Sequence, residues 1–569
     1  MSMKSLVKEF LRYPEPQFAR AAFSFLDGEW EVSLGGKPYR AIRVPYCVES
    51  ELSGIGEKGF VYDLRYRKTF AAPQHKKDER VILHFGAVDR YAKVCVNGVS
   101  VGSHCGGYTP FSFDITDALQ DGENLLEVAV HDDVHENSPS GKQSGKEQSY
   151  GCMYTRTTGI WQSVWLECVP QERLLGIRFY PSAENCSVRM EATAQTEGEF
   201  LAEITYDGKT VGKCGGHLNY RGVFETKLTE KHLWELGAGR LYRVRLQFGE
   251  DTVYSYFGLR DVRYEGKTFL LNGKPVFQRL VLDQGYYPEG VYTPRSEDDF
   301  VRDIELALQL GFNGARLHQK VFDPKVLCLC DVYGYMVWGE YPSWGMRVRN
   351  LDALGVFLGE WREAVERDFN HPCIVTWCPL NEMWSDPEDE RWVRDVRFAD
   401  AAYAFTKALD PTRPCIDVSG GLHGHKTDVA DFHFYGSLEK LKAHMEDAER
   451  GAPSFDKMYL SGEGIEYKGE PLHLSEFGGV RFGNFADGWG YEDEQKEEEF
   501  VARYEKTVAF LLGCGQLSGF CYTQLYDVEQ EQNGLYYYDR RPKLSRQGLR
   551  RIREANAAVA ACEVNPEKA

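Results

Sequence analysis

His371-Pro-Cys-Ile-Val-Thr-Trp-Cys-Pro-Leu-Asn-Glu-Met-Trp384 is the stretch that decides how the second half of the chain is expected to fold. Cys373 to Leu380 form a nearly continuous apolar run, short and rich in β-branched residues, which predicts a short buried strand. The run ends at Asn381 and Glu382, so this carboxylate lies at the strand's carboxyl end, where barrel enzymes carry their chemistry. The alternative is that Glu382 is a solvated loop residue that caps the next helix.

A second stretch has the same form. His473-Leu-Ser-Glu-Phe-Gly-Gly479 predicts another short strand that ends in a carboxylate, Glu476, before glycines that permit a tight turn. Two glutamates at strand ends of one sheet can face each other across a pocket. At a separation of about 5–5.5 Å they suit a retaining glycosidase, with one acid/base and one nucleophile.

Around these two stretches, residues 263–569 alternate strand and helix patterns. Eight such units over about 300 residues predict a (β/α)8 TIM barrel with its catalytic loops at the carboxyl ends of the strands. The predicted strands are Val276–Leu282, Phe312–His318, Met336–Glu340, Cys373–Leu380, Cys415–Val418, Val429–Tyr435, Leu472–Glu476 and Leu517–Tyr522. The helices that follow include Glu297–Leu310, Leu358–Phe369, Glu390–Leu409, Leu438–Glu449, Asp493–Leu512 and Ser545–Ala557.

The first 262 residues read as β structure. Residues 1–170 alternate apolar and polar positions, and Asn97-Gly98 is a hairpin signal, so we expect a jelly-roll β-sandwich. Residues 171–262 continue in short strands that suit an immunoglobulin-like β-sandwich without a disulfide pattern. The polar stretch from His135 to Ser149 predicts a mobile loop, and whether it reaches another domain's pocket stays open.

Composition excludes several classes of protein. A net charge of -19 disfavours nucleic acid and anionic membranes as partners, and no apolar run approaches a membrane span. The first twenty residues have no apolar core of a signal peptide, and the 15 cysteines are scattered without a CxxC pair. We therefore expect a cytoplasmic protein with reduced cysteines and no metal site.

The motifs, taken in order along the chain, resemble glycoside hydrolase family two, the family of β-galactosidases, β-glucuronidases and β-mannosidases. The resemblance covers essentially the whole chain and implies the same three domains in the same order. It rests on Thr157-Thr-Gly-Ile-Trp-Gln-Ser-Val-Trp165, Leu271-Asn-Gly-Lys-Pro-Val-Phe277, His371-Pro-Cys-Ile-Val-Thr-Trp377, Asn381-Glu382, Asp410-Pro-Thr-Arg-Pro414 and Ser475-Glu-Phe-Gly478.

The resemblance implies a role for each matching residue. Glu382 would be the acid/base and Glu476 the nucleophile, while Asn381 would bind the sugar 2-hydroxyl. Arg316 would hold the nucleophile ionised, and Tyr435 would donate a hydrogen bond to it. For each of the last two, packing or surface pairing is the alternative.

Three further residues are candidates for sugar binding. Asp283 and Glu340 follow predicted strands and could bind hydroxyls, and Trp344 could stack on the substrate. Loop pairing and packing explain them equally well.

The chain departs from the family pattern in its last loops. Relatives that bind glucuronate use an Asn-x-Lys pair, whereas this chain has Asn533-Gly-Leu535, which supplies no cation unless Lys320 or Lys543 substitutes. Many relatives have a tryptophan after strand eight, where this chain has Cys521-Tyr-Thr-Gln-Leu-Tyr-Asp527. The sequence therefore favours a β-galactosidase-like specificity, and β-glucuronidase and β-mannosidase stay open.

The predicted function is a retaining exo-β-glycosidase that acts on a carbohydrate substrate without a cofactor. The rival from another class is a non-catalytic carbohydrate-binding relative that keeps the fold. The sugar, the aglycone and the physiological glycan stay open, and so does the oligomeric state, including a homo-oligomer.

Overall fold

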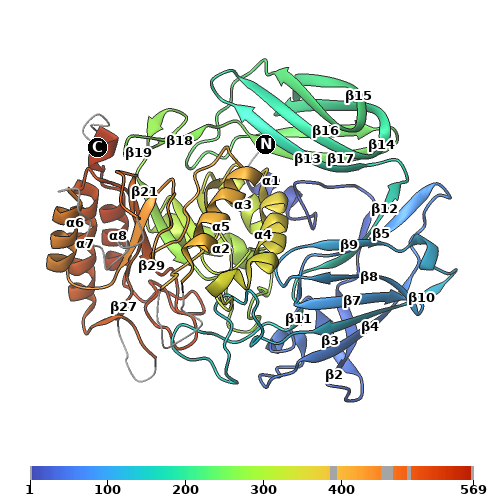
Figure 1. Ribbon diagram of the computed structural model, residues 1–569, viewed down its shortest axis with the longest axis horizontal. Coiled ribbons are helices and arrows are strands. Elements are labelled where there is room, and N and C mark those ends of the chain that lie inside the picture. Colours follow the sequence, from blue (N-terminus) through green and yellow to red (C-terminus); the bar gives the residue numbers. More distant parts are fainter. Residues whose placement is uncertain (1–2, 385–393, 450–464, 483–487, 565–569) are drawn as a thin grey trace.

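The computed structural model describes residues 3–384, 394–449, 465–482 and 488–564. Two β domains lie on one side of a third domain that holds nearly all the helices (Figure 1). Within the described residues no helix combines the length and apolarity that a membrane crossing requires.

The first domain is a two-layer sandwich, as predicted. One sheet has the order β1-β12-β5-β9 and the other β3-β2-β4-β10-β7-β8, with a core of aliphatic and aromatic side chains between them. Asn97 and Gly98 both have positive φ and form the tight turn between β7 and β8. The strands are β1 (Phe23–Phe25), β2 (Gly28–Leu34), β3 (Arg40–Val44), β4 (Asp63–Ala71), β5 (Glu79–Phe85), β7 (Tyr91–Val96), β8 (Val99–Cys105), β9 (Phe111–Asp114), β10 (Glu123–His131) and β12 (Val164–Pro170), with β6 (Val88–Asp89) pairing with β11 (Gly159–Ile160).

The first residues of the chain differ from the predicted β structure. Helix α1 (Met3–Phe10) packs against barrel helix α3 (Pro324–Tyr333), and the ring of Phe10 lies 4.6 Å from that of Tyr256. Its apolar residues Met3, Leu6, Val7 and Phe10 follow the i, i+3, i+4, i+7 spacing of an amphipathic helix, a local signal that the prediction of β structure for residues 1–170 overlooked.

The second domain is one antiparallel sheet built around a long hairpin. Strands β14 (Ser187–Tyr206) and β15 (Lys209–Lys227) pair along their length, and a register shift between Thr193 and Glu197 interrupts the ladder. The sheet is completed by β13 (Leu174–Ser182), β16 (Leu241–Phe248) and β17 (Asp251–Gly258). Its assignment to the immunoglobulin-like class stays a prediction.

The third domain contains seven parallel strands in the order β24-β23-β22-β21-β29-β26-β25. They are β21 (Gln278–Asp283), β22 (Gly314–Leu317), β23 (Met336–Glu340), β24 (Ile374–Cys378), β25 (Ala430–Phe434), β26 (Leu472–Gly478) and β29 (Leu517–Thr523). The helices are α2 (Glu297–Gln309), α3, α4 (Leu354–Asp368), α5 (Val396–Leu409), α6 (Leu438–Glu449), α7 (Glu497–Gly513), α8 (Arg546–Asn556) and α9 (Ala561–Val564). Strands β18 (Val262–Glu265), β19 (Thr268–Leu271) and β20 (Lys274–Pro275) form a small sheet, and β27 (Val480–Phe482) pairs with β28 (Glu492–Glu494).

The predicted strand Cys415–Val418 is not a regular strand. It meets β24 through single parallel bridges, Trp377 with Cys415 and Asn381 with Ser419, so an irregular segment lies next to β24 where the eighth strand was expected. Proline at 414 and glycines after Val418 limit the ladder here. The helix predicted from Glu390 begins at Val396, and residues 390–393 lie outside the described part of the chain. Together with this segment, the sheet matches the predicted barrel.

Candidate active site

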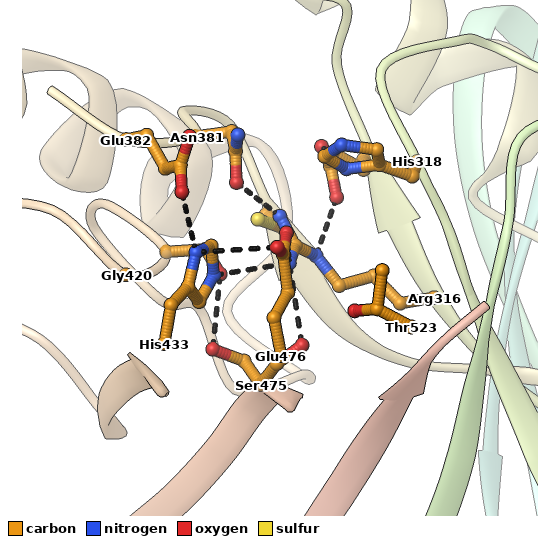
Figure 2. A network of polar contacts seen from close by, with 12 residues as sticks. Arg316, His318, Asn381, Glu382, Gly420, His433, Ser475, Glu476 and Thr523 are labelled. Carbon is orange, nitrogen blue, oxygen red and sulfur yellow. Dashed lines mark hydrogen bonds and ion pairs between the residues drawn. The ribbon is translucent and has the colours of Figure 1, made fainter. Parts of the chain in front are cut away.

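The carboxyl ends of the barrel strands bring together five residues predicted for the site. Arg316 comes from β22 and Glu476 from β26, while Asn381 and Glu382 follow β24 (Figure 2). Tyr435 is the residue after β25. Because parallel strands end at one edge, residues far apart in sequence meet in one polar network.

Glu382 and Glu476 face each other at short range. One carboxylate oxygen of each lies within 4.8 Å of the other and of a ring nitrogen of His433. An oxygen–oxygen distance of no more than 4.8 Å fits the roughly 5–5.5 Å between the carboxyl groups of retaining glycosidases better than the longer spacing of inverting ones.

Glu476 is held as a carboxylate. Arg316 Nη1 donates to its Oε1 at 2.8 Å, and the Tyr435 hydroxyl donates to its Oε2. Burial favours the neutral acid, but the positive charges of His433 and Arg316 outweigh burial and lower the pKa of Glu476 to about 2. An ionised, oriented carboxylate is what nucleophilic attack requires.

Arg316 is the centre of this network and is fully buried. Its guanidinium also donates to Asn381 Oδ1 and, at 2.6 Å, to Glu340 Oε2. The other Glu340 oxygen lies 2.9 Å from His318 Nδ1 and accepts from the Gln319 backbone. Both Glu340 oxygens are thus occupied by the protein, and Glu340 orients Arg316 and His318.

Asn381 keeps one polar atom unpaired. Its Nδ2 is buried without a hydrogen-bond partner among the described residues, and the Trp344 indole N–H donates to its backbone oxygen at 3.2 Å. A buried amide N–H without a hydrogen-bond partner costs free energy unless a ligand accepts its hydrogen bond. The arrangement leaves this amide as a donor for a substrate oxygen.

Asp283, at the end of β21, is bonded within the protein. Its Oδ1 accepts from the Tyr526 hydroxyl and from Gly285 N at 2.9 Å. Burial, with help from Asp303, raises the pKa of Asp283 to about 6.

Glu382 has a backbone conformation that is unusual outside glycine. Its φ is 48°, and its N–H donates to Ser419 O at 2.8 Å. Left-handed backbone at a non-glycine residue carries strain and gathers at functional sites. The irregular segment beside β24 therefore sets the direction of the Glu382 side chain.

A cavity of about 610 Å³ opens beside Glu382 and is shared between domains. Asn381, Glu382, Trp344 and Trp384 line it from the barrel. From the first domain the lining includes Val134, His135, Glu136, Ser140, Gln143, Gly145, Lys146, Tyr150, Gly151, Cys152 and Met153. The loop from His135 to Ser149 does reach the cavity beside Glu382, a point that the sequence left open.

The same loop delivers a buried lysine that sequence reasoning missed. Lys142 is 6% exposed, and its ammonium lies 5.6 Å from the ring centres of Tyr154 and Trp344. Burial opposes its charge, but Glu531 foremost, with smaller effects from Glu476 and Glu382, raises the pKa of Lys142. In the described part of the chain this ammonium has no hydrogen bond or ion pair.

A hydrogen bond between Tyr154 of the first domain and Glu531 of the barrel domain joins the two domains near this lysine. The Tyr154 hydroxyl donates to Glu531 Oε2 at 2.5 Å, and Asn533 Nδ2 donates to Oε1 at 3.0 Å. The loop that lacks the expected Asn-x-Lys pair therefore presents a buried carboxylate toward a lysine of the first domain.

The two lysines considered as substitutes are occupied. Lys320 donates to the backbone oxygens of Gly285 and Tyr292, and burial lowers its pKa to about 7. Lys543 donates to Asp527 and to Gln532 O. Both ammonium groups are thus bonded within the protein.

Among the residues that the structure describes, two groups of side chains are spaced closely enough to hold a metal ion. Besides Glu382, His433 and Glu476, they comprise Asp331, His371 and Cys373. In the second group Asp331 already accepts from His371, Tyr256 and the Cys373 backbone. Hydrogen bonding explains this group without an ion.

Comparison with known proteins gives two family matches. The model described as "Glycosyl hydrolase 2 galactose-binding domain-like" matches residues 48–162, and "Glycosyl hydrolases family 2, TIM barrel domain" matches residues 262–480. A β-galactosidase of Thermoanaerobacter pseudethanolicus is 28% identical over 58% of this chain and 46% of its own. A β-glucuronidase of Rattus norvegicus is 27% identical over 68% of this chain and 66% of its own. The chain thus aligns with about half to two thirds of these relatives' lengths.

Solved structures share the fold over nearly the whole chain. The β-D-glucuronidase of Dictyoglomus thermophilum has a TM-score of 0.77 at 22% identity and covers 96% of this chain and 99% of its own. A β-galacturonidase of Eisenbergiella tayi has a TM-score of 0.74 at 21% identity, with 95% and 97% covered. At these identities the likeness establishes the fold alone. With both family models matched in order along the chain, this protein belongs to glycoside hydrolase family 2.

Proposed function

We propose that the protein is a retaining exo-β-glycosidase that works by double displacement. The short spacing of Glu382 and Glu476, with Glu476 held ionised, is the observation that carries the proposal. The chemistry needs two carboxyl groups in different protonation states, and the network around Glu476 supplies the ionised one.

In the first step Glu476 attacks the anomeric carbon while Glu382 gives its proton to the leaving oxygen, and the glycosidic bond breaks. In the second step Glu382 takes a proton from water, the resulting hydroxyl adds to the anomeric carbon, and Glu476 is released. No cofactor enters either step.

Three neighbours have supporting roles in this proposal. The unpaired amide of Asn381 donates to a hydroxyl of the sugar ring. Arg316 and Tyr435 hold Glu476 ionised and oriented. Trp344 forms a wall of the cavity, and its ring offers apolar surface to a sugar face.

For the sugar, a β-galactoside-like neutral glycone is the first candidate. Lys320 and Lys543 are bonded within the protein, and the loop after β29 contributes the carboxylate of Glu531. A uronic acid carboxylate near Glu531 would meet like charge.

One observation favours a second candidate, a uronide. Lys142 is a buried ammonium without a protein partner in the described residues, and its charge reaches both glutamates. A substrate carboxylate would satisfy it.

A panel of aryl β-glycosides tests both the class and the sugar. It contains galactoside, galacturonide, glucoside, glucuronide, mannoside and arabinoside, each assayed with the unmodified protein, Glu476→Ala and Lys142→Met. Turnover that Glu476→Ala abolishes supports the glycosidase. If the unmodified protein hydrolyses a uronide well and neutral glycosides poorly, and Lys142→Met loses the hydrolysis of the uronide, the substrate is a uronide.

The opposite pattern, neutral sugars preferred over their uronic acid counterparts, would select the neutral glycone. If the protein is folded but hydrolyses none of the glycosides in the panel, the carbohydrate-binding alternative is favoured.

A further inference from the structure

His433 contacts both glutamates. It lies on β25 with a side chain that is 4% exposed, and its Nδ1 is 2.8 Å from Glu382 Oε1 and 3.4 Å from Glu476 Oε2 (Figure 2). The sequence showed it only as part of His433-Phe-Tyr435 and assigned it no role.

The neighbours of the two ring nitrogens show that Nδ1 carries a proton. Arg316 Nη1 lies 3.3 Å from His433 Nε2, and a guanidinium only donates hydrogen bonds. Ser419 Oγ lies 3.2 Å from the same nitrogen and donates its hydrogen bond to Asp431 Oδ2 at 2.7 Å. Nδ1 faces carboxyl oxygens of both Glu382 and Glu476, so Nδ1 carries a proton that points at Glu382.

The local backbone is shaped around this ring. A side chain at Gly420 would place its first carbon 2.2 Å from ring atoms of His433, and Gly420 has a φ of +67°. Only glycine fits both the space and the conformation. The same segment, through Ser419, fixes the backbone of Glu382.

We propose that His433 is a positioning residue for Glu382, which deepens and rests on the proposed glycosidase function. Its Nδ1–H engages Oε1, so the acid proton of Glu382 resides on Oε2. When Oε2 gives that proton to the leaving oxygen, Oε1 and Oε2 share the new negative charge, and the hydrogen bond from Nδ1 becomes charge-assisted. His433 thereby stabilises Glu382 as its charge develops, an interaction stronger in the transition state than in the ground state.

The dependence of rate on the leaving group tests this role. In His433→Ala, kcat/KM should fall about 100- to 1000-fold for a phenyl glycoside, which needs general acid catalysis, and less than about 10-fold for the 2,4-dinitrophenyl glycoside. Azide, which attacks the glycosyl-enzyme without a general base, should accelerate turnover of the dinitrophenyl substrate by the variant. His433→Asn keeps an N–H near the Nδ1 position and should recover most of the loss.

His473→Leu is the matched control. His473 is a fully buried histidine on β26 without a hydrogen bond among the described residues, and its ring lies 4.4 Å from that of Trp338. Its loss should leave the leaving-group dependence as in the unmodified protein.

An equal loss for both leaving groups, or no loss, would overturn the inference while leaving the glycosidase intact. Should His433→Ala fail to fold, His433→Leu, which fills the space without an N–H, takes its place: a leaving-group-dependent loss that His433→Asn recovers supports the role, and equal behaviour of the two variants contradicts it. Absence of turnover in the unmodified protein would instead remove the proposed function itself.

Discussion

Arg316 Nη1 lies 2.8 Å from Glu476 Oε1, and neither side chain is open to solvent beyond a few per cent. A buried ion pair of this kind adds little net stability, but removal of one partner leaves an uncompensated charge. The pair therefore matters for the charge state of Glu476, on which the proposed chemistry depends.

Replacement of Arg316 should shift the acid limb of activity. Without the guanidinium, one of the two main positive charges that oppose burial is lost and the pKa of Glu476 rises, so a larger fraction of Glu476 is protonated at low pH and cannot attack. We expect the acid limb of kcat/KM in Arg316→Met to lie at higher pH than in the unmodified protein, measured between pH 4 and about 8.

Arg413→Met is the control for lost ion pairs. Arg413 is buried and pairs with Asp410 away from the glutamates. Both variants should lose about 3–5 kcal/mol of stability. Only the Arg316 variant should shift the acid limb, and an equal shift in both would refute the electrostatic explanation.

The same pKa predicts how stability depends on pH. The folded-state pKa of Glu476 is about 2, below the ordinary value of 4.5, so folding favours the ionised form. Its contribution to stability is complete above about pH 4.5 and disappears as the pH falls toward 2. Denaturant unfolding should therefore show that the stability difference between the unmodified protein and Glu476→Gln shrinks over this window. A constant difference would argue against the lowered pKa.

Tyr435→Phe should reduce catalysis without unfolding the protein. The variant loses a hydrogen bond to a carboxylate, which contributes about 1.5–3 kcal/mol, or a roughly 10- to 100-fold loss in kcat/KM. Tyr491→Phe is the comparison, because the Tyr491 ring stacks 3.5 Å from Tyr435 but the glutamate bond comes from Tyr435. Equal losses in the two variants would mean that packing, rather than the hydroxyl, is responsible.

Tyr154→Phe should weaken the joint between the first domain and the barrel. It removes a hydrogen bond to buried Glu531, at a cost of about 1–3 kcal/mol in unfolding free energy. Tyr150→Phe, in the same loop, should change stability by less than about 0.5 kcal/mol, because no hydroxyl bond of Tyr150 is lost among the described contacts. Thermal or urea unfolding of both variants measures these two changes in unfolding free energy, and equal changes would contradict the role of the Tyr154 hydroxyl.

The order of strands and helices in the barrel was predictable because apolar runs and amphipathic helices alternate with clear periods. The glutamates were predictable because each ends a buried run: Glu382 after the Cys373–Leu380 run and Glu476 after the His473–Ser475 run. The irregular segment at residues 415–419 was harder to predict, because its residues are typical of a strand while its pairing depends on the neighbouring strands.

The roles of Lys142, Glu531 and His433 could not be predicted. Each depends on contacts between residues more than forty positions apart, and none has a local pattern that differs from loop or strand packing. Glu340 illustrates the reverse, since its position after a strand suggested sugar binding, whereas the structure pairs both its oxygens with Arg316, His318 and Gln319.

In the proposed mechanism Glu476 forms the covalent glycosyl-enzyme. The most direct measurement is mass spectrometry of peptides after incubation with activated 2-deoxy-2-fluoro glycosides of the sugars that the panel identifies. We expect a single adduct on the peptide that contains Glu476, and no adduct on the same peptide of the Glu476→Gln variant. An adduct on another carboxylate, or rapid turnover with inverted product and no adduct, would contradict the proposed mechanism.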